Sequence, residues 1–442
     1  MVMRILIIDF DVQSTCKGFF CMETKEPNKI NRSHGRRFTL TEDHKIHNFN
    51  DIKQELEDRG SGNTSIIEPD WESIAIEEVD TAWGGKTIKA TFTDPLLHGY
   101  SVLLIADTVP EGYDVTSQEY TESEGIVPER ITTMVMRFPR CILPEVNTHR
   151  VFSRNSASSR ARSFKTTLEP IMEDAYVPLF TRNQKGMGGG WVDGKTYLDA
   201  SRYWMYDRDY AVASTLRLLL GDKFIQDKIG VMNWNANYTY MIVHNWRELI
   251  NDYMEHYKAN DVDEYAMPSI HKQNANRLLE PFMWHEALVT STYWKNFLDL
   301  RISDGAQPEI KALAVLVRAV LHEHVPTPSW IHLPFGDPDA LPLDDWGKTS
   351  DALLAAASEC ARISYKDRSS MKNNDNSALG RKLLEQKHMS PFEHIAFDAK
   401  SDVMEDASEL TPLREAVEAH GAQSNLSPSW IQYRRVVSAM EQ

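Results

Sequence analysis

The chain has 442 residues, a formal net charge of -16 at pH 7, 42% hydrophobic residues and 25% charged residues. That balance is typical of a globular protein, and its acidity argues against DNA or RNA as the main ligand, because nucleic-acid binders usually carry a basic surface. The sequence shows neither an apolar run long enough to cross a membrane nor an N-terminal secretion signal, so we expect a cytoplasmic protein with no membrane partner. Four scattered cysteines indicate neither a disulfide framework nor a zinc site.

The N-terminal part gives few functional signals. Residues 3–10 are predicted to form a buried strand, whereas residues 23–62 are polar and typical of a loop or linker. His34, His44 and His47 lie in this polar segment, where histidines are far more often solvated than bound to metal. We therefore expect no metal site here.

Two later segments have the composition of strands. Residues 100–107 and 131–137 are apolar and rich in β-branched side chains. The second leads through Cys141 into the stretch 147–162. Cys141 suggests a nucleophile, but a buried structural cysteine is the favoured interpretation.

The stretch 147–162 is basic in an acidic chain. No acidic residue lies between Val146 and Leu168, and serines alternate with the basic residues Arg150, Arg154, Arg160, Arg162 and Lys165. Arginine offers a planar fork that matches phosphate oxygens, and serine hydroxyls can complete such a site. A solvated basic loop has the same composition, so composition alone leaves both interpretations open.

Helical spacing or composition predicts a series of helices through the rest of the chain. They cover residues 199–220, 234–257, 271–282, 308–322, 351–364 and 377–387. In the segment 308–322, Pro308 suits the first helical turn, and Ile310, Leu313 and Val317 recur at the spacing of a buried face.

The segment 388–394 has the pattern of a helix start. Ser390 and Glu393 are predicted to form a capping box, with Pro391 at the first helical position, which is a sufficient structural explanation for both polar residues. The same geometry would present free amides to a pyrophosphate. A metal site made by His388 and His394 is less well supported, because the HExxH spacing is absent.

Three motifs together resemble those of flavin-dependent thymidylate synthases. His149, Arg150, Ser153, Asn155, Ser158 and Arg160 follow the spacing of the first signature, although Thr148, Ser156 and Ala161 replace the usual Arg, Glu and Tyr. The run 296–301, Asn-Phe-x-x-Leu-Arg, followed by Ala-Gln-x-Glu-Ile is similar to the second, and the segment 388–394 is similar to the third. The third motif follows the first here, which resembles the longer, permuted bacteriophage form.

This resemblance implies an α/β (α+β) fold with a mixed sheet, long helices and an N-terminal extension. Residues 1–96 would be the extension, of unknown role, and residues 97–442 the catalytic domain, with an insertion around 171–265. The resemblance also implies a homotetramer with sites shared between subunits. A phage-encoded chain would act in the host cytoplasm.

The implied activity is reductive methylation of dUMP to dTMP, with FAD as cofactor and NADPH and methylenetetrahydrofolate as co-substrates. One alternative is a related flavin-dependent pyrimidine nucleotide hydroxymethylase or dCMP methylase. A second alternative is a non-catalytic flavin- or nucleotide-binding homologue. Thr148, Ser156 and Glu145, which stands where the family has Gln, are departures in which a change of product could reside.

The resemblance also implies roles for individual residues. The catalytic candidates are Arg301 and Arg160. The substrate-binding candidates are Glu145, Ser158, Ser159, Arg160, Arg277 and Arg301. The cofactor-binding candidates are His149, Arg150, Asn155, Thr290, Thr292, Asn296, His388, Ser390 and Glu393. No metal is implied.

Overall fold

The structure is a computed structural model that describes residues 66–81, 85–157, 164–185, 190–230, 236–258, 270–343, 346–364, 376–401 and 425–440. The chain divides into two units, Met1–Lys45 and Ile46–Gln442, and every described residue belongs to the second. The strand predicted at residues 3–10 and the histidines His34, His44 and His47 lie outside the described residues.

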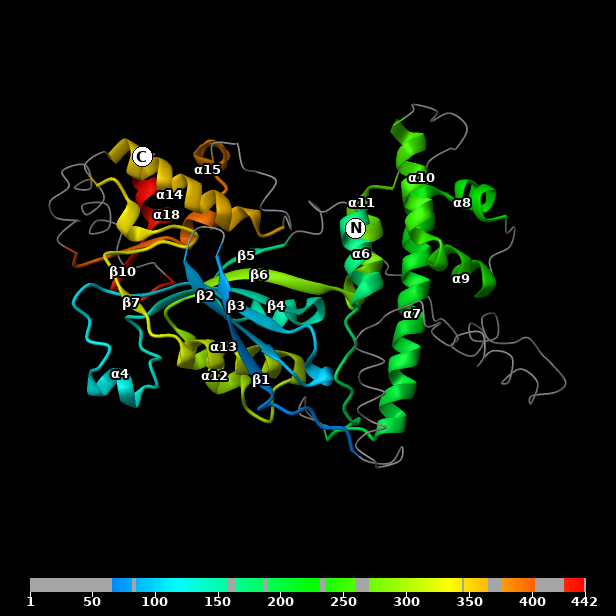
Figure 1. Cartoon of the computed structure of the whole chain (residues 1–442), viewed down its shortest axis with the longest axis horizontal. Coiled ribbons are helices and arrows are strands. Elements are labelled where there is room, and N and C mark those ends of the chain that lie inside the picture. The colour runs from blue at the N-terminus through cyan, green and yellow to red at the C-terminus, as the bar shows by residue number, and fades with distance from the viewer. Residues whose placement is uncertain are drawn as a thin grey trace, which may run out of the picture. The chain divides into compact units, whose positions relative to one another are not determined.

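The described residues form a seven-stranded sheet with the order β1-β2-β3-β4-β6-β5, and a short strand, β7, pairs with β3 (Figure 1). The strands are β1 (Ile74–Asp80), β2 (Lys86–Phe92), β3 (Ser101–Val109), β4 (Ile131–Pro139), β5 (Ser153–Ser156), β6 (Trp284–Ser291) and β7 (Thr327–Pro328). All neighbours are antiparallel except β7 on β3, which is parallel. The sheet therefore starts before residue 97, although the boundary of the predicted extension stays a prediction.

Both strands predicted at residues 100–107 and 131–137 are confirmed, as β3 and β4. They are buried along nearly their whole length, because layers cover both faces of the sheet. One face packs against α12 (Trp294–Arg301) and α13 (Pro308–Glu323), and Ile310, Leu313 and Val317 of α13 are fully buried. On the other face Ile105 and Leu288 pack against Cys360 and Ile363.

A group of helices precedes β6 in the chain. Its members are α6 (Phe164–Glu173), α7 (Gly194–Leu220), α8 (Asp222–Ile229), α9 (Ala236–His244), α10 (Trp246–Lys258), α11 (Lys272–Ala275) and the 3-10 helix η4 (Asn276–Phe282). Figure 1 shows α8, α9 and α10 beside the long helix α7, and all three pack on it. Asp193 caps α7 by accepting from the amide of Thr196 at 3.0 Å, and Gly221 ends it at φ 84. The helix predicted over 234–257 is two helices, separated at Asn245.

The C-terminal part builds a second, three-stranded antiparallel sheet, with the order β10-β9-β8. Its strands are β8 (Ile331–His332), β9 (Ala396–Asp398) and β10 (Trp430–Gln432). Around it lie α14 (Trp346–Ala361), η6 (Arg362–Ser364), α15 (Asn376–Glu385), η8 (Ser390–Glu393) and α18 (Tyr433–Met440). Phe392, Phe397 and Tyr433 belong to the hydrophobic cluster that joins these elements.

Short elements complete the described chain. They are η2 (Pro95–Leu97), α4 (Gln118–Glu122), η3 (Arg140–Ile142), α5 (Leu143–Val146) and η5 (Pro338–Ala340). The fold is thus a mixed α/β protein with an antiparallel main sheet and long helices. Among the described residues no helix has the length and apolarity to span a membrane.

Candidate functional site

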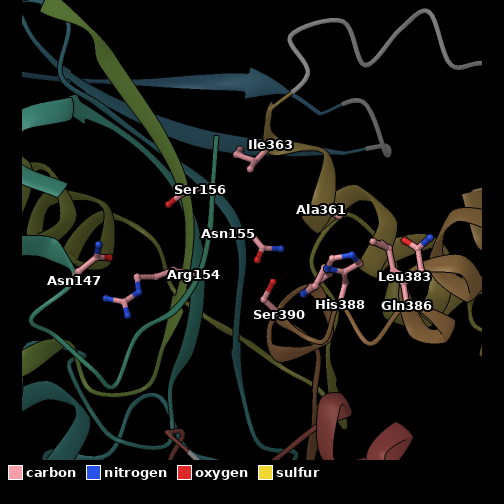
Figure 2. A pocket seen from close by; sticks show the side chains of 11 residues that line it. Asn147, Arg154, Asn155, Ser156, Ala361, Ile363, Leu383, Gln386, His388 and Ser390 are labelled. Atoms are coloured by element: carbon pink, nitrogen blue, oxygen red, sulfur yellow. The ribbon is translucent and has the colours of Figure 1, made fainter. Parts of the chain in front are cut away.

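A pocket of about 520 Å³ opens where the edge strand β5 meets the C-terminal elements (Figure 2). Its lining, which we call the β5 pocket, consists of Asn147, Arg154, Asn155, Ser156, Ala361, Ile363, Leu383, Gln386, His388, Ser390 and Pro391. The stretch 147–156 and the segment 388–391 are more than two hundred residues apart in the chain. The fold therefore brings the first and third motifs to one place.

The period of two along β5 sorts its side chains onto two faces. Ser153 and Asn155 are buried, while Arg154 is half-buried and Ser156 is exposed. The Asn155 amide donates to the carbonyl of Cys360 at 3.1 Å, and the Ser153 hydroxyl accepts from Gln432 at 3.1 Å. In Figure 2 Asn155 lies toward Ser390 and His388, whereas Arg154 lies on the other side of the strand, near Asn147. The β5 pocket thus has an amide-lined part and a cationic part.

The predicted capping box at Ser390 and Glu393 is wrong. Residues 390–393 form a single short 3-10 helix whose N-cap is Met389, and no side chain caps it. Glu393 instead pairs with Arg434, and its backbone carbonyl accepts from Gln432 at 3.2 Å. The cause is a tertiary contact. Glu393 binds residues of the C-terminal segment and not the start of its own helix, which a local sequence pattern cannot show. The predicted pyrophosphate site relied on that capping geometry and is therefore no longer supported at this helix start.

The turn before η8 presents His388 to the β5 pocket. Lys387 has a φ of 58, and the amides of Lys387 and His388 donate to the carbonyls of Leu384 and Leu383, both at 2.8 Å. A residue with positive φ just beyond a helix is a common way to end it, normally with glycine there. This turn directs the chain from α15 to His388 and Ser390, both exposed and both lining the pocket.

Arg154 is the cation of the β5 pocket. One terminal nitrogen, Nη1, donates to the carbonyls of Val146 at 3.2 Å and His149 at 3.5 Å. Burial lowers the pKa of Arg154, and Glu393 only partly offsets that effect. Within the described residues Arg154 makes no ion pair, so its charge is incompletely compensated.

Arg301 lies in a second polar group, which we call the Arg301 cluster: Glu145, Thr148, His149 and Arg301. The guanidinium donates to His149 Nε2 at 3.0 Å through Nε, to Glu145 Oε2 at 3.2 Å through Nη1, and to Thr148 Oγ1 at 3.2 Å through Nη2. Glu145 and Thr148 are two of the positions that depart from the family pattern. Both departures thus contact the same arginine.

Thr290 and His394 belong to a buried hydrogen-bond chain that connects the two sheets. Its links are Thr108 Oγ1–His332 Nδ1 at 2.8 Å, His332 Nε2–Thr133 Oγ1 at 2.7 Å, Thr133 Oγ1–Thr290 Oγ1 at 2.6 Å and Thr290 Oγ1–His394 Nδ1 at 2.7 Å. Register explains the central link, because Thr133 and Thr290 face each other on β4 and β6. Burial lowers the pKa of both His332 and His394 to about 3, so both imidazoles are neutral.

The expected site residues fall into four groups. Asn155, His388 and Ser390 line the β5 pocket. Glu145, His149 and Arg301 meet in the Arg301 cluster. Thr290, Thr292 and Glu393 have partners within the chain, Thr292 by accepting from the Ser427 amide at 2.9 Å. Arg150, Arg277 and Asn296 are exposed.

Ser158, Ser159 and Arg160 lie outside the described residues, so their expected roles stay predictions. Among the other pocket residues, Arg154 was named from the sequence as part of the basic stretch, and Ser156 as a departure from the family pattern. Asn147 and Gln386 had no role assigned to them. Gln386 carried no such signal.

Cys141 is exposed, which contradicts the expectation of a buried cysteine. It follows β4 in the short helix η3, at the surface rather than in the core. Although the residue as a whole is exposed, its thiol is partly buried, and this burial, followed by Glu309, raises the pKa of Cys141 to about 11. A thiol that holds its proton at neutral pH is a poor nucleophile.

Within the described residues no group of three or more His, Cys, Asp or Glu side chains is placed to hold a metal ion.

Comparison with known proteins finds little similarity. No family model matches the chain, and no curated protein matches it. A solved structure that it resembles is the UMP/dUMP methylase PolB from Streptomyces cacaoi bound with 5-Br UMP. The two share 15% sequence identity and a TM-score of 0.31, over 51% of this chain and 92% of that chain.

The comparisons do not support the assignment to the flavin-dependent thymidylate synthases that the three motifs suggested, because no family model matches the chain. The motif residues also have structural explanations in this chain, because Thr290, Thr292 and Glu393 bind other parts of the protein. Contacts within the protein can therefore account for these motif residues without a flavin cofactor.

Proposed function

We propose that the chain binds a pyrimidine nucleoside monophosphate beside β5 and adds a one-carbon group to C5 of its ring. The observation that carries the proposal is Arg154. It is a half-buried guanidinium, without an ion pair among the described residues, in a pocket lined by amides and hydroxyls. A partly buried cation without a counter-ion favours an anionic ligand, and a phosphate accepts from an arginine fork with good geometry.

The phosphate end of the ligand is assigned to Arg154. Two backbone carbonyls hold its Nη1, so the guanidinium is oriented before a ligand arrives. Asn155, Ser390 and His388 line the same pocket on the other side of β5 and offer donors to the rest of the ligand. Such a set suits a phosphate with an attached sugar better than it suits an apolar ligand.

The ring end is assigned to the Arg301 cluster. Asn147 lines the β5 pocket, and the next residue, Thr148, contacts Arg301 at 3.2 Å. C5 of a pyrimidine is a weak nucleophile until negative charge develops on the ring. A fixed guanidinium near the ring would stabilise that charge in the transition state. Arg301 is the residue that we expect to do so.

FAD is the cofactor that the sequence motifs implied, and its expected contacts do not form one site within the described residues. Three of them line the β5 pocket, but Thr290 and Thr292 are buried with partners in the chain. The requirement for FAD, NADPH and methylenetetrahydrofolate stays a prediction, checked by visible absorbance of the purified protein and its bleaching by NADPH. Colourless protein that still converts nucleotide would contradict it.

The test of the proposed function is nucleotide binding by Arg154 variants. Arg154→Ala should weaken binding of UMP and dUMP about ten- to a hundredfold, since a charge-assisted hydrogen bond contributes about 1.5–3 kcal/mol. Arg154→Lys keeps the charge without the fork and should recover only part of the affinity. Calorimetric titration measures both.

Two controls sharpen that test. Uridine, which has no phosphate, should bind the parent protein and Arg154→Ala equally. Arg247→Ala removes an exposed arginine of α10 that does not line the pocket, and it should bind like the parent. Equal affinity of Arg154→Ala and the parent for UMP and dUMP would refute the phosphate assignment. Mass analysis of the nucleotide after turnover then separates a methyl from a hydroxymethyl product, uracil from cytosine, and an enzyme from a non-catalytic binder.

A further inference from the structure

The Arg301 cluster holds one guanidinium at three points. The three acceptors, on Glu145, Thr148 and His149, come from α5 and the turn after it, and each contacts a different nitrogen of Arg301. A guanidinium has five N–H groups, so these contacts use three of them and leave two. One N–H remains on each terminal nitrogen, Nη1 and Nη2.

The ring of His149 is held by aromatic neighbours. Phe152 stacks on it with centroids 5.5 Å apart and planes at 27°, and Phe297 meets it edge-on at 5.0 Å and 87°. The residue is 6% exposed. Its ring plane is therefore set by packing, and its Nε2 lone pair faces Nε of Arg301.

The protonation state follows from this geometry. Nε2 accepts a hydrogen bond from a permanent cation, so the imidazole is neutral and its proton is on Nδ1. The charged groups that act on it are Arg301 and Arg154, and Glu145 lies across the same guanidinium. Burial, then Arg301 and Arg154, lowers the pKa of His149 to about 4. A role for His149 as proton donor near neutral pH does not fit these contacts.

We propose that His149 is a positioning residue that fixes the plane of the Arg301 guanidinium and so directs its two remaining N–H groups at the pyrimidine ring. The proposal rests on the proposed function. Glu145 and Thr148 contact the two terminal nitrogens, and with these two contacts alone the guanidinium can still turn about the line that joins them. The additional contact at Nε, with a ring that cannot itself rotate, removes that freedom. A fixed donor costs no reorganisation as ring charge develops.

Two substitutions separate the hydrogen bond from the packing. His149→Phe keeps an aromatic ring between Phe152 and Phe297 but has no acceptor. His149→Gln can place its amide oxygen near the position of Nε2. We expect His149→Phe to lower kcat about tenfold or more, with a smaller change in KM for the nucleotide, because the contact matters most in the transition state. His149→Gln should recover part of kcat.

A control variant lies on the same helix as Arg301. Lys295→Ala removes an exposed side chain of α12 and should keep the parent's kcat and KM. A purely structural role for His149 would reduce the amount of folded protein in both His149 variants and leave kcat per folded site unchanged. That result, or an unchanged kcat in His149→Phe, would overturn the proposal.

Nitrogen NMR of the histidine ring tests the contact itself, without a nucleotide. In protein labelled with ¹⁵N-histidine, His149 is identified as the signal missing from His149→Gln. We expect the neutral Nδ1–H tautomer in the parent, and a shifted Nε2 resonance with a higher pKa in Arg301→Met, because the neighbouring cation is gone. An unchanged His149 signal in Arg301→Met would refute the contact. If the contact is present but no pyrimidine nucleotide binds to the parent, the proposed function fails instead.

Discussion

Two arginine–carboxylate pairs in this chain differ in how far their side chains are buried. The side chains of Arg130 and Asp107 are 1% and 0% exposed, whereas those of Arg301 and Glu145 are 16% and 23% exposed. Burial alone raises the pKa of Asp107, but Arg130 and His324 outweigh it and lower that pKa to about 2. The first pair is enclosed by the fold. The second remains accessible, which a ligand-binding arginine requires.

Removing Arg130 should destabilise the protein strongly. Its guanidinium binds Asp107 and also donates to the carbonyls of Gly125, Leu321 and His324 at 2.8–3.0 Å. Arg130→Met leaves Asp107 buried without its arginine partner. We therefore expect the free energy of unfolding, measured by urea denaturation, to fall by about 3–5 kcal/mol. The double variant Arg130→Met/Asp107→Asn should recover part of this loss. No recovery would show that the backbone contacts matter more than the charge pair.

At the scale of elements, the pocket wall depends on how closely α14 and α15 approach. A Cβ placed on Gly380 of α15 would clash with the backbone oxygen of Leu354 in α14. These helices and the turn after α15 carry the pocket residues Ala361, Leu383 and Gln386. Gly380 thus permits the distance between the helices that shapes the β5 pocket.

Gly380→Ala should therefore push the two helices apart. We expect a loss of about 1–3 kcal/mol in the free energy of unfolding, because the clash is with backbone and the helices must shift. Nucleotide affinity should fall as well, since the pocket wall moves. Lys382→Ala on an exposed position of α15 is the matched control and should change neither quantity appreciably. A Gly380→Ala variant as stable as that control would contradict the close packing.

At the scale of the molecule, two neutral histidines join the main sheet to the C-terminal sheet. His332 and His394 are fully buried and lie in one hydrogen-bond chain through Thr133 and Thr290. Their pKa of about 3 lies below the value of about 6.5 in an unfolded chain. Between these values the unfolded state binds more protons, so the free energy of unfolding decreases as the pH falls.

From this difference we expect a marked loss of stability between pH 7 and pH 5. The loss should be roughly 2 kcal/mol for each histidine, because the unfolded chain gains those protons over that range and the folded chain does not. Urea unfolding at the two pH values measures it. The double variant His332→Gln/His394→Gln should be less stable at pH 7 and should show a smaller pH dependence. Equal stability of the parent at pH 7 and pH 5 would contradict neutral, buried imidazoles.

Periodicity and composition identified the elements with strong local signals. β3, β4, α7 and α13 lie where the sequence predicted them, because their apolar residues repeat at the spacing of a strand or helix that is covered by a core. Segments whose form depends on distant partners were predicted less well. The break at Asn245 and the 3-10 form of residues 390–393 have no strong local signal.

For the candidate site, the sequence identified the basic stretch and the histidine-containing segment, and the family resemblance assigned residues of both to one cofactor site. The Ser-x-Asn spacing at 153–155 places both side chains on one face of a strand, and β5 has that geometry. Residue type could not show that Glu145, Thr148 and His149 would converge on Arg301. Nor could it show that Thr290 would bind Thr133 and His394 instead of facing the pocket.

By itself, the sequence determined which segments are strands and helices, and that arginines gather in one stretch of an acidic chain. Only the tertiary structure decided that the arginine of the β5 pocket has no counter-ion among the described residues, that Arg301 is held by three acceptors, and that Arg130 is enclosed with an aspartate. The physical reason is that local backbone preference depends on near neighbours in the chain. The charge, burial and hydrogen bonding of a side chain depend on residues that are often a hundred or more positions away, as with Arg154 and Glu393 or Thr290 and His394.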